Sequence, residues 1–422
     1  MKRHVLKRVK ISLLFLLSAA QTVSVHAFAN PNLYYAQPFS DSSRPERRGL
    51  FSTSLWAVHG ATTEGRDGTG AVTNVLGIYG VHKMYQVGRD VGGQTITDVA
   101  PGILANLWNV VATDDAYAQL AFTGRAVCAT GALDVAFNLT PEFFFGASIP
   151  YYSVDIQNSV FTDLTPAAAQ NAQWVQFLAN FNAILAANNL NILGIKQTGI
   201  GDVAVYAGWT KNNEDAEDLD FADLTIRLGA LLGNAQKKDQ DKAFSIAPGY
   251  DGHKAFLADV ALSIGANSII TLDFYAKLLA FFKQTLNVRM QTAQGQNGFI
   301  KLAKGSAERS LGSLYELGAS VSCEVLEPMS VSLGYSYAHK GIDKLTAANA
   351  TLFPAAIVNS DSMLQGWSHH VVHIGIDLNF THNERAIHPH VGLFYNRVIK
   401  AHSSFFNHTV GGDFGLAITW NF

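Results

Sequence analysis

The carboxylates that could carry chemistry occur singly along the chain, and no two of them have the spacing of a catalytic acid–base pair. Ser403 and Ser404 stand beside His402, but adjacency in sequence is not a triad, and no nucleophile-elbow glycines surround them. We therefore expect neither an enzyme nor a cofactor. Ten charged or imidazole side chains instead occupy polar positions where they would line a polar interior: Asp134, Asp202, Asp223, Arg227, Asp259, Asp273, Lys277, Glu316, His373 and Asp377.

Histidines gather late in the chain, where His369, His370 and His373 are followed by further imidazoles up to His402. A strand places residues i and i+4 about 13 Å apart, so His369 and His373 cannot both bind one metal ion directly. A zinc site would need partners from a neighbouring strand. We expect no metal site and interpret these residues as histidines near the rims of the fold.

Alternation of large apolar with small or polar residues is the feature that positions these side chains. It recurs in about twelve segments, near residues 50–60, 133–137, 143–151, 203–209, 224–230, 256–264, 270–278, 315–322, 331–337, 372–380, 390–398 and 413–422. A period of two is that of a strand, and about ten residues suffice for a tilted strand to cross a bilayer. The pattern predicts an all-β fold, a transmembrane antiparallel β-barrel of about twelve strands; an extra hairpin between residues 61 and 130 would make fourteen.

The final segment, DFGLAITWNF, places five large apolar residues on one face: Phe414, Leu416, Ile418, Trp420 and Phe422. A chain that stops on such an aromatic residue resembles the C-terminal signature of bacterial outer-membrane barrels. That resemblance implies that the segment closes the barrel and is read by the barrel-assembly machinery. It also implies outer-membrane lipid as the surroundings of the apolar face.

The first 29 residues read as a secretory signal peptide. Lys2, Arg3, Lys7, Arg8 and Lys10 precede an apolar run and the small-x-small site Ala27-Phe28-Ala29. Removal of these five positive charges moves the formal net charge from −3 to −8, because −3 − 5 = −8, so a nucleic-acid partner is not expected. Residues 30–48 would form a free tail or a plug, and residues 49–422 the barrel.

Composition agrees with a barrel better than with a helical membrane protein. Only 15% of the residues are charged, and the mean hydropathy is +0.11 without an uninterrupted apolar run of about eighteen residues. The two cysteines, Cys128 and Cys323, are too few for a disulfide framework and fall on opposite faces of their segments, so we expect both to be unpaired.

The connections alternate between short and long, as in outer-membrane barrels. We expect short inner turns at residues 138–142, 211–220, 266–267, 327–328 and 381–386, and outer segments at 61–118, 155–198, 234–252, 284–309, 341–365 and 400–409. Residues 165–191 lack alternation and place Trp174, Phe181 and Leu185 near helical spacing. They predict a helical outer loop, either a surface helix or a gate over the barrel mouth.

The charged residues of the polar face admit two interpretations. Opposite charges at neighbouring strand positions could form a ladder that orders the wall and sets the field along a channel. Alternatively, the same groups would only hydrate and brace a polar interior.

The middle of the chain holds a glycine-rich junction between a loop and a strand. It reads TGIGDV from Thr198 to Val203 and continues as YAGW from Tyr206 to Trp209. This junction resembles that of outer-membrane transporter barrels in the family assigned to the meta-pathway of phenol degradation, which are similar in style to long-chain fatty-acid transporters. The resemblance extends over residues 199 to 340, although Ala247-Pro248-Gly249 stands where the family has Pro-Thr-Gly. It implies passage of small hydrophobic or aromatic molecules.

The expected function is passive uptake of small solutes through an outer-membrane channel, filtered by the charge and width of the lumen. The alternative is a surface structural or adhesion barrel with a closed lumen.

Overall fold

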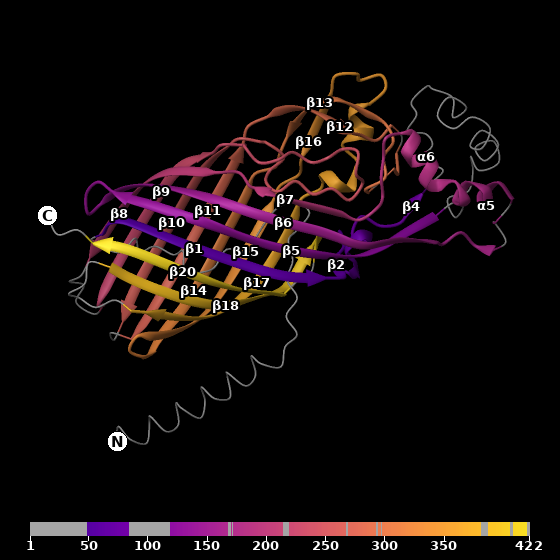
Figure 1. The fold of residues 1–422 in the computed structure, drawn as a ribbon. Coiled ribbons are helices and arrows are strands. Elements are labelled where there is room, and N and C mark those ends of the chain that lie inside the picture. Colours follow the sequence, from indigo (N-terminus) through magenta and orange to yellow (C-terminus); the bar gives the residue numbers. More distant parts are fainter. Residues whose placement is uncertain are drawn as a thin grey trace, which may run out of the picture.

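A computed structural model describes residues 49–83, 119–167, 170, 172–213, 219–266, 269–292, 294–296, 298–380, 387–405 and 408–419 of the 422-residue chain. The predicted signal peptide, the 30–48 segment, Trp420 and Phe422 lie outside these residues. Within them, antiparallel strands dominate, and the structure is consistent with the all-β prediction (Figure 1).

Twelve strands form the barrel wall, and each pairs with the strand that follows it around the wall. β20 pairs with β1, so the pairing returns to its starting point and the barrel is closed. The predicted number of twelve is confirmed. The strands are β1 (Gly49–Thr62), β5 (Gln119–Asn138), β6 (Phe143–Asp163), β8 (Ala204–Asn213), β9 (Phe221–Leu231), β10 (Ala255–Ala266), β11 (Ile270–Phe281), β14 (Leu314–Leu326), β15 (Met329–Lys340), β17 (Trp367–Asn379), β18 (Ile387–His402) and β20 (His408–Thr419).

Short strands beyond this wall belong to the outer segments. β4 (His82–Lys83) pairs with the outer part of β5, and β7 (Ile195–Ile200) with that of β6. Two small sheets are formed by other short strands. One contains β2 (Glu64–Arg66), β3 (Val72–Asn74) and β19 (Ser404–Phe405), and the other β12 (Gln284–Arg289), β13 (Lys304–Ser310) and β16 (Lys344–Ala347). Between residues 61 and 130, no described strand adds a hairpin to the barrel ring.

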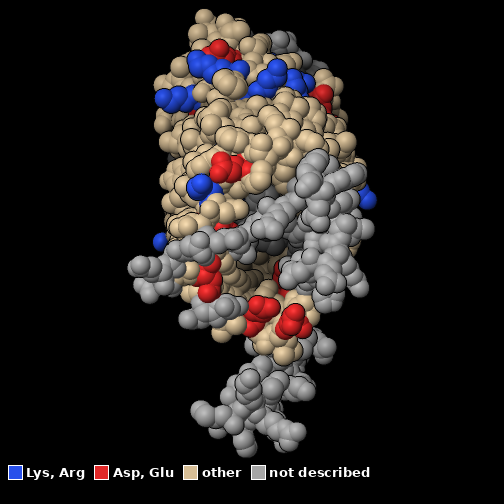
Figure 2. Space-filling model, turned by 90° about the vertical axis from the view of Figure 1, so that its left-hand side faces the viewer, with Lys and Arg blue, Asp and Glu red and all other residues tan. Residues whose placement is uncertain are grey.

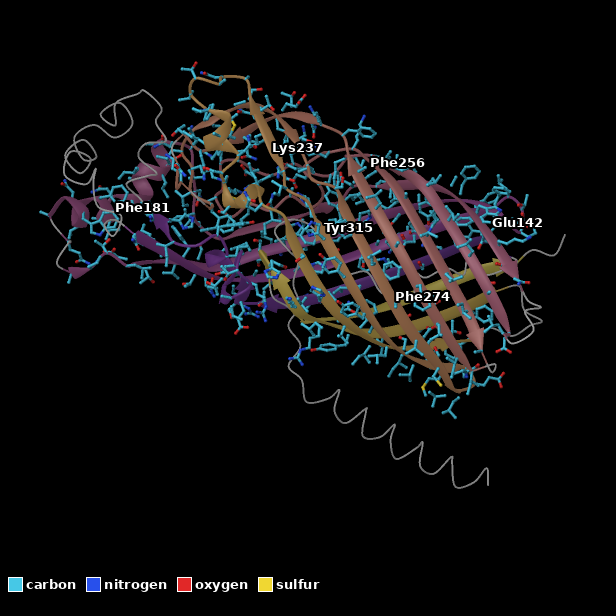
Figure 3. The ribbon with its side chains drawn as sticks, turned by 180° about the vertical axis from the view of Figure 1, so that it is seen from behind. Glu142, Phe181, Lys237, Phe256, Phe274 and Tyr315 are labelled. Carbon is cyan, nitrogen blue, oxygen red and sulfur yellow. The ribbon has the colours of Figure 1, made fainter. Side chains whose placement is uncertain are left out.

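The outward face of the wall is apolar, because the alternation turns every second side chain away from the lumen. Phe256, Phe274 and Tyr315 on β10, β11 and β14 are exposed and point outwards (Figure 3). Figure 2, which looks at the left-hand end of Figure 1, shows mostly uncharged side chains, with Lys and Arg gathered at the top of the view and several Asp and Glu near its lower end. Phe414 on β20 is exposed in the same way; the side chains of Leu416 and Ile418 are not described.

The outer segments pack into a second core beyond the barrel mouth. The predicted helical loop forms two short helices, α5 (Ala172–Ala179) and α6 (Phe181–Ala187), whose Trp174 and Phe181 are fully buried. They form one buried apolar cluster with residues of several other outer segments, including Phe122, Phe244 and Phe299. In the part of the chain that is described, no helix has the length and apolar character needed to cross a membrane.

Val358 and Leu364, from two of the three remaining helical turns, belong to a smaller apolar cluster under β12, β13 and β16, and the third turn contacts β2 and β5. The turns are η2 (Val75–Gly77), α7 (Ala355–Val358) and η5 (Ser362–Leu364). Cys128 is buried and Cys323 is partly buried, and the two are not joined by a disulfide.

Candidate functional site: the barrel lumen and its outer mouth

A row of alternating charges crosses four adjacent strands inside the barrel. Strand register places Arg227 opposite Asp259, Asp259 opposite Lys277, and Lys277 opposite Glu316. Arg227 Nε donates to Asp259 Oδ1 at 3.1 Å, and both side chains are largely buried. Because each charge faces an opposite charge on the next strand, the row stabilises this part of the wall.

Aromatic rings support the row from the positions beside it. Tyr275 donates its hydroxyl to Glu316 Oε1 at 2.6 Å, and the Lys277 ammonium lies 5.0 Å from the centre of the Tyr275 ring. The Arg227 guanidinium lies 5.7 Å from the Tyr206 ring. These contacts orient the charged groups, since cations are attracted to aromatic faces.

A second polar row lies nearer the short turns. Ser263 is opposite both Asp223 and Asp273 in register, and its hydroxyl donates to Asp273 Oδ1 at 2.6 Å. Further along this row, the two ring nitrogens of His373 lie 2.7 Å from Ser336 Oγ and 2.8 Å from Asn396 Oδ1. His373 thus takes part in a cross-strand hydrogen-bond network.

The lumen contains a cavity of about 170 Å³ between these strands and the opposite wall. Six of the ten residues selected from the sequence line it: Asp134, Asp202, Arg227, Asp259, Lys277 and Glu316. Asp223, Asp273, His373 and Asp377 do not; the first three are buried and Asp377 is partly buried. Four carboxylates and two cations therefore border the cavity, an excess of negative charge.

The opposite wall of the same cavity carries an apolar cluster beside one carboxylate, Asp134, which is opposite Ser54 of β1 in register. Trp56 on β1 lines it, and packs with Val58, Ala132 and Phe394 in one buried cluster. In the ring of twelve strands, β1 lies six strands from β11, which carries Lys277. A solute in the lumen would therefore meet the row of alternating charges on one side, and an indole ring beside a single carboxylate on the other.

An apolar patch on three adjacent strands, called the collar below, lies one inward-facing position outside the charged row. Leu257, Leu279 and Leu314 are register neighbours there. Tyr250, from the segment between β9 and β10, packs against this collar, and its ring centre lies 4.7 Å from that of Phe281. Burial, together with nearby Asp202 and Glu316, raises the pKa of Tyr250, so its hydroxyl stays neutral.

Asp202 holds this segment over the barrel mouth. Its carboxylate accepts the backbone N–H of Ala235 at 2.9 Å and that of Tyr250 at 2.5 Å. A side chain at Gly249 would collide with that carboxylate, and one at Gly201 with the carbonyl oxygen of Pro248. The glycines of the TGIGD junction and of Ala247-Pro248-Gly249 therefore permit the close approach of these two segments.

Beyond the collar lies an outer chamber of about 120 Å³, bordered by the outer segments. Of the residues that the structure describes, Tyr250 is the one that lines both the outer chamber and the lumen cavity. The two cavities thus lie in sequence, with Tyr250 at their junction.

Sequence reasoning missed the collar, Tyr250 and the chamber. The collar leaves a weak signal, because Leu257, Leu279 and Leu314 are large apolar residues at inward-facing positions. Tyr250 leaves none, since it lies in a segment without alternation. Within the described ranges, no group of three His, Cys, Asp or Glu side chains is placed to hold a metal ion.

The closed ring, its apolar outer face and its polar lumen define the class of this protein, a transmembrane antiparallel β-barrel. No family model matches the sequence, and no curated protein is significantly similar to it. Among solved structures, it is similar to an outer membrane channel from Pseudomonas putida F1, with a TM-score of 0.49 and 9% identity over 90% of this chain and 99% of that one.

Two further solved structures are similar at lower scores. A Pseudomonas aeruginosa FadL homologue has a TM-score of 0.33 and 11% identity, covering 94% of this chain and 100% of that one. The β domain of the Bordetella autotransporter BrkA has a TM-score of 0.33 and 9% identity, covering 88% and 100%. These are likenesses between barrels, and the fold of this chain is defined by its own strand pairing.

Proposed function

We propose that this protein is a bacterial outer-membrane channel for passive uptake of small solutes. The observation that carries the proposal is the series of outer chamber, apolar collar and charged lumen cavity, joined at Tyr250. The sequence supports the location, because the predicted secretory leader precedes a barrel whose exposed face suits lipid. Folding of the barrel in that membrane would then need the assembly machinery.

The lining favours solutes that are partly apolar. Leu257, Leu279 and Leu314 offer no hydrogen bonds to an ion that sheds its water, so this part of the lining disfavours an inorganic ion. Below it, Trp56 offers an apolar contact on one side and the charged row hydrates the other. A small molecule with an apolar part would pass more readily than an inorganic ion of similar size.

Planar-bilayer recording tests the proposal. We expect rare, small conductance steps from the wild type and larger or more frequent ones from Tyr250→Ala, because that change removes the side chain at the junction. Tyr315→Ala is the matched control, since Tyr315 lies on the outer face of the wall and should leave conductance unchanged.

The alternative, a structural or adhesion barrel with a closed lumen, is favoured by one observation: the outer segments pack into a compact core over the mouth. Silence from folded wild type and folded Tyr250→Ala alike would support this alternative and contradict a channel.

A further inference from the structure

Cations and carboxylates at the outer chamber are mostly paired with one another. Three cations pair with three carboxylates: Lys301 with Asp361, Lys340 with Asp343, and Arg309 with both Asp343 and Asp251, at 2.8 and 3.1 Å. Within this network the charges cancel. Such pairs brace the chamber wall and leave no net attraction for a ligand.

Two other cations at the chamber are engaged by the outer segments themselves. Arg289 donates to the backbone carbonyl oxygens of Gln240, Asn188 and Leu302, and its guanidinium lies 3.2 Å from Asp241. Lys242 is exposed and lies 3.7 Å from Asp239. Each of these cations thus has a carboxylate beside it: Arg289 connects β12 to other outer segments, and Lys242 pairs within its own segment.

Lys238 differs from both groups. Its backbone N–H donates to Asp251 Oδ1 at 2.8 Å, which fixes its position, while its side chain lines the chamber. Within the described part of the chain, no carboxylate is paired with its ammonium. Lys238 therefore contributes one positive charge, without an ion-pair partner among the described residues, to a partly closed cavity. There its attraction for an anion is stronger than at an exposed surface.

The remaining walls of the chamber are largely apolar. They include Ile246, Val288, Phe299 and Leu311, which are buried. A single ammonium suits a monoanion, and apolar walls disfavour an ion that must stay fully hydrated, such as phosphate.

We propose that the outer chamber binds a small organic monocarboxylate, with its carboxylate at Lys238 and its apolar body against Ile246 and Phe299. The lumen cavity beyond Tyr250 has an excess of carboxylates, which repel this ligand. The ligand is therefore held in the chamber, in front of the collar. Binding of this ligand does not require that the protein transports it. Only a decrease in conductance on ligand binding would rest on the proposed channel function.

Calorimetric titration of the folded, detergent-solubilised protein tests this with three probes of one shape: sodium benzoate, benzamide and benzylammonium. We expect benzoate to bind at least about tenfold more tightly than the other two, a difference of about 1.4 kcal/mol. Lys238→Met should weaken benzoate about tenfold or more. Lys237→Met, a change at the exposed neighbouring residue outside the chamber lining (Figure 3), should leave the affinity within about twofold.

The pH dependence of benzoate affinity distinguishes a lysine that binds the ligand from one that only supports the chamber wall. Burial, then repulsion by Lys301, lowers the pKa of Lys238 to about 8. Arg309 also lowers it, whereas Asp251 and Asp361 raise it. The cation is therefore present below pH 8 and lost above it, so benzoate affinity should fall by about tenfold between pH 7 and pH 9. Lys238→Arg should retain binding and abolish this dependence.

Several outcomes would overturn the site. They are absence of benzoate binding to the wild type, equal binding of benzamide, tighter binding of inorganic phosphate than of benzoate, and unchanged affinity in Lys238→Met. Heat-modifiable gel mobility establishes that each variant is folded. Channel activity without benzoate binding would refute the binding site and leave the proposed channel function standing. Benzoate binding without conductance would refute the channel function and leave the binding site standing.

Discussion

The Arg227–Asp259 pair offers the sharpest test of the charged row, through the substitution Asp259→Asn. The two side chains are 13% and 8% exposed and their atoms lie 3.1 Å apart. At an effective dielectric constant of about 20, two unit charges at that distance attract by about 5 kcal/mol. Removal of one partner of a buried pair typically costs about 3–5 kcal/mol, because the other charge stays desolvated. We expect a loss of that size in the free energy of unfolding.

Reversible unfolding of the barrel in lipid vesicles by guanidinium, followed by tryptophan fluorescence, measures this change. Asp239→Asn is the matched control, since Asp239 lies 3.7 Å from Lys242 in an exposed pair that should be worth less than about 1 kcal/mol. The double variant Arg227→Met, Asp259→Leu should recover most of the lost stability, because an apolar pair of similar volume leaves no buried charge.

Two results would refute this reasoning. A cost below about 1 kcal/mol for Asp259→Asn would mean that water screens the row fully. A double variant as unstable as the single one would mean that packing, and not the uncompensated charge, causes the loss.

Three further predictions concern the outer segments. Asp202→Ala should release the segment after β9 and increase both its proteolysis and the channel conductance, because two backbone N–H groups lose their acceptor. Trp174→Ala should destabilise the outer core by about 3–5 kcal/mol, seen as faster hydrogen exchange in α5 and α6 with barrel strands unchanged; uniform exchange would contradict it. Burial disfavours ionised Asp343, but Arg309 and Lys340 outweigh it and lower its pKa. Ionised Asp343 therefore stabilises the folded state at a pH above the carboxyl pKa of the unfolded chain, and this stabilisation is lost as the pH falls through the lower pKa of the folded state. The outer segments should become protease-sensitive as the pH falls below about 4, and those of Asp343→Asn should be sensitive already at pH 7.

The local pattern of the sequence was sufficient to predict the strands of the barrel wall. Phe256 and Val260 alternate with Leu257 and Asp259, and a period of two assigns faces without knowledge of any neighbour. Short runs between segments predicted the inner turns for the same reason, and the two that are described in full, at residues 138–142 and 327–328, lie where they were expected. The spacing of Trp174, Phe181 and Leu185 indicated the helices. These are properties of residues close together in sequence.

The candidate site depended on contacts that the pattern does not contain. The sequence admitted a charge ladder as one interpretation, but strand register decided that Arg227, Asp259, Lys277 and Glu316 form one row, and a slip by one residue would have separated them.

By itself, then, the sequence determined the barrel and its two faces, because alternation is local. Only the tertiary structure decided how the outer segments are held over the mouth. Asp202 reaches backbone groups at Ala235 and Tyr250, tens of residues away, and the outer segments meet around Lys238 from separate loops. Such long-range contacts result from packing of whole segments, and no period in the chain encodes them.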